Sequence, residues 1–72
     1  MNETKYMIEC ITRDLILKLM SDKDMNMQEA VDTLYNSDTY EKLKDTRTGL
    51  YFQSTGYVYD YLNKELLTGK MQ

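Results

Sequence analysis

The chain has 72 residues, a formal net charge of −3, one cysteine, and neither histidine nor proline. This length fits one domain near the lower limit of what folds alone, where a disulfide, a metal or a partner chain usually adds stability. A single cysteine excludes an internal disulfide, and the lack of histidine removes the commonest transition-metal ligand. Self-association or a protein partner is therefore the expected source of additional stability.

The distribution of charge and hydrophobicity narrows the expected partners. The nine basic residues are scattered, and the chain lacks the basic face that nucleic-acid binding requires, so nucleic acid is disfavoured as a partner. The sequence contains no apolar run of about 18 residues, so no membrane span is predicted. The start of the chain also lacks the apolar core of a signal peptide. With one free thiol, we expect a cytoplasmic protein.

The first predicted helix extends from about Glu3 to Lys23. One apolar stripe follows helical spacing and contains Ile8, Ile11, Leu15 and Leu19. A second, thinner line of Tyr6, Cys10 and Leu17 falls on the opposite side, within roughly 40° at 100° per residue. A helix that is apolar on two sides either lies centrally in its bundle or contacts another chain.

A second helix is predicted from Met27 to about Asn36. Asn26 is its expected N-cap, and Glu29 three residues later completes a capping box. The apolar stripe of this helix consists of Met27, Ala30, Val31, Leu34 and Tyr35.

A short third helix is predicted from Asp38 to about Lys44, with Ser37 as its cap. Asp38 lies near its positive end and Lys44 near its negative end, which suits the helix dipole. Tyr40 and Leu43 are expected to face inward.

The last part of the chain is predicted to contain a short extended segment followed by a fourth helix. Leu50–Phe52 is apolar and is interpreted as an extended plug over the bundle. Ser54 or Thr55 should cap a helix from about Gly56 to Thr68, with Gly69 as the residue after its end. Its expected buried face consists of Val58, Tyr61, Leu62 and Leu66. The predicted fold class is therefore all-α, a single domain of residues 1–72 forming a bundle of three to four helices.

Seven tyrosines and six methionines are many for a chain of this length. Tyrosine provides rigid, amphipathic contact area and is enriched at interfaces, whereas a small protein can also use it to complete its core. Both interpretations stay open for the cluster near the last helix. The residues predicted to contact a partner are Tyr6, Cys10, Leu17, Tyr51, Tyr57 and Tyr59.

No catalytic, cofactor-binding or metal-binding residue is predicted. Without histidine, the usual base for an activated nucleophile is missing, and Cys10 in an apolar helix is interpreted as a core thiol. Asp22 and Asp24 alternate as in a calcium loop but lack the glycine and the terminal glutamate. No small-molecule substrate is evident.

Three segments of the second half, Tyr35–Leu43, Thr48–Ser54 and Gly56–Leu62, resemble a signature of small, uncharacterised bacterial helical proteins. The resemblance covers about residues 29–66 and implies a short helical domain without an assigned activity. More weakly, the chain is similar to proteins encoded beside toxin–antitoxin partners.

The resulting functional hypothesis is a non-enzymatic protein-interaction module that forms a homodimer or binds an operon-encoded partner. The alternative is a small DNA-binding regulator or toxin–antitoxin component, in which the second and third helices imitate a helix-turn-helix. The recognition helix would then be Asp38–Lys44, carrying Lys42 and Lys44, with Arg47 beyond it.

Overall fold

The computed structural model describes residues 3–68, which form four α-helices and two 3-10 turns and contain no β-strand. The predicted all-α bundle is therefore confirmed. In chain order the elements are α1 (Glu3–Asp22), α2 (Met27–Tyr35), α3 (Asp38–Lys44), η1 (Thr46–Thr48), η2 (Leu50–Phe52) and α4 (Thr55–Thr68).

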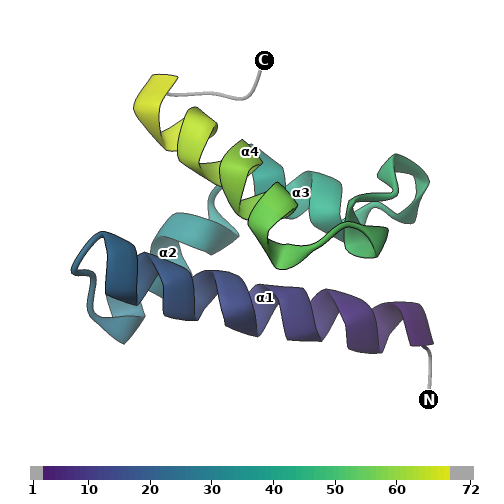
Figure 1. Cartoon of the computed structure of the whole chain (residues 1–72), viewed down its shortest axis with the longest axis horizontal. Coiled ribbons are helices and arrows are strands. Elements are labelled where there is room, and N and C mark those ends of the chain that lie inside the picture. The colour runs from purple at the N-terminus through teal and green to yellow at the C-terminus, as the bar shows by residue number, and fades with distance from the viewer. Residues whose placement is uncertain (1–2, 69–72) are drawn as a thin grey trace.

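Helix α1 forms one long side of the molecule, and the other elements pack on it from one direction (Figure 1). Both α2 and α4 contact α1, while α3 packs mainly on α4. The turn η2 also contacts α1, so the loop before α4 covers part of that helix. This arrangement leaves a side of α1 that no other described element covers.

The core is built from the inner faces of all four helices and from η2. On α1, Ile11, Leu15 and Leu19 are buried, as the first stripe predicts. A Leu-to-Ala change at such sites typically costs about 2–5 kcal/mol of stability. The buried apolar residues are Ile11, Leu15, Leu19, Ala30, Leu34, Leu43, Leu50, Val58, Tyr59 and Leu62.

Local side-chain caps determine where the helices begin. At the start of α2 the Asn26 side chain accepts from the Glu29 amide at 2.8 Å, and the Glu29 carboxylate accepts from the Asn26 amide at 2.9 Å. The Ser37 hydroxyl accepts from the Tyr40 amide at 3.0 Å and donates to the Leu34 carbonyl at 2.6 Å. Ser37 therefore joins the end of α2 to the start of α3. Of the two predicted caps of α4, Ser54 accepts the Tyr57 amide at 3.1 Å.

The buried carboxylate of Glu65 connects α4 to the first turn of α3. One of its oxygens accepts from the Asp38 amide at 2.8 Å. The other accepts from the Thr39 amide at 2.9 Å and from the Thr39 hydroxyl at 2.8 Å. Glu65 is 8% exposed, and Thr39 is fully buried. Three hydrogen bonds thus compensate the desolvation of this carboxylate and satisfy amides that the helix itself leaves unpaired.

The prediction of an extended segment at Leu50–Phe52 is wrong, because these residues form the 3-10 turn η2. Gly49 adopts a left-handed φ of 73° and redirects the chain. The Phe52 amide then bonds to the Gly49 carbonyl, and the Gln53 amide bonds to the Leu50 carbonyl. The turn still covers the bundle, because Leu50 is buried.

The predicted buried face of α4 is partly wrong. Val58 and Leu62 are buried as expected, but Tyr59 and Glu65 complete the face in place of Tyr61 and Leu66. The hydrogen bonds of Glu65 to α3 explain this orientation, because they turn position 65 inward and leave Leu66 exposed. The predicted end residue Gly69 lies outside the described residues.

Replacing the buried carboxylate should weaken the whole fold. We expect Glu65→Gln to lower the free energy of unfolding by roughly 1–3 kcal/mol, because an amide can accept at only one of the two positions. The exposed Asp60→Asn on the same helix is the matched control and should change stability little. Urea unfolding followed by circular dichroism measures both, and equal midpoints for Glu65→Gln and the wild type would contradict the prediction.

The two described glycines should respond in opposite directions to alanine. Gly49→Ala should destabilise by about 1 kcal/mol, because a side chain disfavours the left-handed backbone even though space for it exists. Gly56→Ala, in the first turn of α4, should stabilise by up to about 0.5–1 kcal/mol through reduced backbone entropy. Thermal unfolding of both variants tests the pair, and a melting temperature of Gly49→Ala at or above that of the wild type would be inconsistent with it.

Candidate functional site

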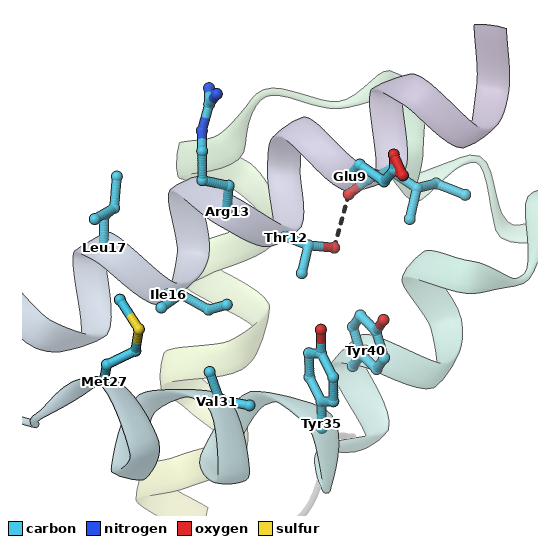
Figure 2. Close-up of a pocket in the computed structure, with 10 residues that line it drawn as sticks. Glu9, Thr12, Arg13, Ile16, Leu17, Met27, Val31, Tyr35 and Tyr40 are labelled. Atoms are coloured by element: carbon cyan, nitrogen blue, oxygen red, sulfur yellow. Dashed lines mark hydrogen bonds between the residues drawn. The ribbon is translucent and has the colours of Figure 1, made fainter. Parts of the chain in front are cut away.

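An apolar groove runs between α1 and α2 and ends at α3 (Figure 2). Its volume is about 390 Å³. We call it the α1–α2 groove; its lining comes from α1 (Ile8, Glu9, Thr12, Arg13, Ile16, Leu17), α2 (Met27, Val31, Tyr35) and α3 (Tyr40).

The floor and the edge of this groove differ in character. Figure 2 shows Thr12 and Ile16 directed toward α2, whereas Arg13 and Leu17 leave α1 on the side away from α2. The Thr12 hydroxyl donates to the Ile8 carbonyl at 2.7 Å, so it is already satisfied within α1. Leu17 is 53% exposed and Met27 61% exposed at the edge. The groove therefore offers apolar contact area, with the charged side chains of Glu9 and Arg13 along its lining.

Two stacked tyrosines close the groove at α3. The rings of Tyr35 and Tyr40 lie 4.7 Å apart with an interplanar angle of 5°, and their hydroxyls point toward α1 (Figure 2). The Lys44 ammonium lies 4.9 Å from the centre of the Tyr40 ring. Burial is the main cause that raises the pKa of Tyr40, and Lys44 opposes it. The phenol is therefore a hydrogen-bonding group at neutral pH and a poor base.

A second, shallower groove lies where η2 meets the first half of α1, with a volume of about 290 Å³. It brings together three of the predicted contact residues, Tyr6, Cys10 and Tyr51. A hydrogen bond with the Cys10 thiol is the largest cause that raises the pKa of Tyr6, while Arg13 lowers it. At the edge, the Thr55 hydroxyl donates to Asp14 at 3.2 Å and fixes the start of α4 on α1.

The remaining predicted contact residues lie elsewhere. Tyr57 is half exposed on α4, and its ring lies 5.3 Å from that of Tyr61. Tyr59 is 9% exposed and belongs to the core, with the Lys18 ammonium 5.4 Å from its ring centre. Burial raises the pKa of Tyr59. Its ring is therefore not available as a contact surface, which corrects the prediction for this residue.

The predicted line of Tyr6, Cys10 and Leu17 is exposed or half-buried along its whole length. It opens on both grooves, because Tyr6 and Cys10 border the second groove and Leu17 borders the α1–α2 groove. Cys10 is thus half-buried at the surface and not a core thiol. Met27 and Tyr35 belong to the predicted apolar stripe of α2, and the structure places both along the α1–α2 groove.

Neither a metal cluster nor a membrane span is found among residues 3–68: no three Cys, Asp or Glu side chains there gather as metal ligands, and no helix there is long and apolar enough to cross a bilayer. No protein-family model matches the chain, and no curated protein or solved structure matches it significantly.

The raised pKa of Tyr40 predicts a loss of stability at high pH. Unfolded tyrosine loses its proton near pH 10, whereas folded Tyr40 retains it. Because the folded state then binds more protons, stability falls as the pH rises through about 10. We expect this fall to be smaller in Tyr40→Phe, which keeps the ring stack. Urea unfolding of both proteins between neutral pH and about pH 11 measures it, and equal slopes would contradict the assignment.

Proposed function

We propose that the chain is a non-enzymatic protein-interaction module that binds its partner through the α1–α2 groove. The observation that carries the proposal is the exposure of Leu17, Met27 and Tyr35 around one apolar groove. The chain as a whole is polar, with a mean hydropathy of −0.65. Apolar side chains gathered in a concave surface are typical of sites that bind another protein.

The chemistry of the groove favours binding over catalysis. The Thr12 hydroxyl is engaged within α1, and the two tyrosines offer hydrogen bonds at the closed end. Glu9 and Arg13 are exposed side chains at the edge, where water screens their charges. A general base or nucleophile would need a neighbouring group that tunes its pKa, and the groove contains no such arrangement among the described residues.

The partner is a second copy of the chain or a separate protein, such as one encoded in the same operon. The free thiol supports a cytoplasmic location for this module. The sequence resemblance supports a toxin–antitoxin context.

DNA binding through α3 has less support than protein binding. The carboxylate of Glu65 occupies the amides of Asp38 and Thr39, which a phosphate would otherwise approach. Lys44 forms an ion pair with Glu41 at 3.2 Å, and Arg47 pairs with Asp45 at 2.9 Å. The basic side chains of this region are therefore partly neutralised by their own neighbours.

A single charge placed at the edge of the groove should disrupt binding. We expect Leu17→Glu to weaken the complex that the wild type forms by at least about 2 kcal/mol, the scale of an interface hot spot. Leu67→Glu is the matched control, since Leu67 is 76% exposed on α4 and outside the groove.

Sedimentation velocity measures self-association, and affinity purification from the native host measures binding to another protein. Binding that both variants retain equally, or a wild-type chain that forms no complex in either assay, would overturn the proposal. Circular dichroism should give the same helix content for both variants, because both leucines are exposed.

A further inference from the structure

The uncovered side of α1 carries a self-complementary pattern of side chains. In chain order it presents Tyr6, Glu9, Arg13 and Leu17, which are an aromatic, an acid, a base and an aliphatic residue. At 100° per residue these four positions fall within roughly 80° of one another, on one face of the helix. Tyr6 is 56% exposed and Leu17 53% exposed, and Glu9 and Arg13 are both exposed.

From this pattern we infer that the occupant of this face is a second copy of the chain, with the two α1 helices packed antiparallel about a twofold axis. The inference rests on the proposed function and identifies the partner of the module as a second copy of the same chain. A twofold axis between Glu9 and Arg13 brings each Glu9 opposite Arg13 of the second copy. The same operation brings each Tyr6 beside Leu17 of the other copy.

Charge complementarity favours this occupant over an unrelated apolar helix. An apolar ligand would cover Glu9 and Arg13 without providing partners, which costs desolvation free energy. In the antiparallel pair, two ion pairs form between Glu9 of one copy and Arg13 of the other. Two Tyr–Leu contacts flank these ion pairs. Tyr6 and Leu17 are about 16 Å apart along the helix, so the four contacts occupy three turns of α1.

The local contacts of Arg13 leave its guanidinium free to pair with Glu9 of a second copy. Arg13 contacts the neighbouring Asp14 at 3.3 Å, but both side chains are exposed, and such an ion pair is worth little in water. Asp14 is held by Thr55 and remains in place if Arg13 reorients. Lys18 lies on the other flank of α1 over the Tyr59 ring, so its charge stays outside the contact.

The Leu17 end of the contact is continuous with the α1–α2 groove. Both Leu17 and Met27 line that groove, but Figure 2 shows Met27 between α1 and α2, whereas Leu17 leaves α1 on the side away from α2. Tyr6 of the second copy therefore meets Leu17 at the outer edge of the groove. There Tyr6 buries more of its ring, while its hydroxyl keeps its hydrogen bond with the Cys10 thiol.

Paired charge reversals test the arrangement. Glu9→Arg places two positive side chains opposite each other twice in a homodimer, and Arg13→Glu places two negative ones there. We expect each variant alone to raise the dissociation constant of the dimer by about tenfold or more. An equimolar mixture of the two variants restores opposite charges at both contacts, so it should form a heterodimer with near wild-type affinity.

Sedimentation velocity on the wild type, each variant and the mixture gives the association constants. Circular dichroism should show unchanged folding, since both sites are exposed. A wild-type chain that stays monomeric, single variants that dimerise like the wild type, or a mixture that does not recover would each overturn the inference. A wild-type monomer that instead binds a different protein, in a manner lost in Leu17→Glu, refutes the homodimer while leaving the proposed function intact.

Discussion

The buried carboxylate of Glu65 is the interaction on which the second half of the molecule depends. Helix α3 has seven residues, too few to be stable alone in water. Glu65 holds its first turn from α4, and Ser37 holds it from α2. Tyr40 lies in the first turn of α3, so the hydrogen bonds from Glu65 also fix its position. They thereby fix the stacking of Tyr40 on Tyr35, which closes one end of the α1–α2 groove. The buried hydrogen bonds of Glu65 thus help to determine the shape of the α1–α2 groove at the surface.

Helix α1 serves the core and the surface at once. Its inner face supplies Ile11, Leu15 and Leu19, while α2, α4 and η2 cover that face from one direction. The other elements of residues 3–68 are too few to surround a twenty-residue helix, so its outer face stays in contact with water. For a chain of this size, exposed apolar side chains such as Tyr6 and Leu17 on that face are expected where further burial comes from association.

Local signals made much of the fold predictable. Helical spacing identified α1, and the caps at Asn26 and Ser37 identified the starts of α2 and α3. The 3-10 turn at Leu50–Phe52 was missed because three apolar residues carry no measurable period. The burial of Glu65 depends on partners 26 and 27 residues away, which no local pattern encodes.

The candidate surface was only partly predictable for related reasons. Tyr6 and Leu17 follow from helical spacing, and they are exposed as a contact line requires. Met27 and Tyr35 belong to the apolar stripe of α2 yet are exposed, because a stripe shows which face is apolar but not how much of it a neighbour covers. The hydrogen bonds from Glu65 to the start of α3 also have a consequence for synthesis on the ribosome. The cap of α2 comes from residues three positions apart, whereas the cap that Glu65 gives to α3 forms only after Glu65 is translated. In that interval α3 lacks its packing on α4, so Leu43 is without its final contacts and the nascent chain is open to chaperone binding or misassembly.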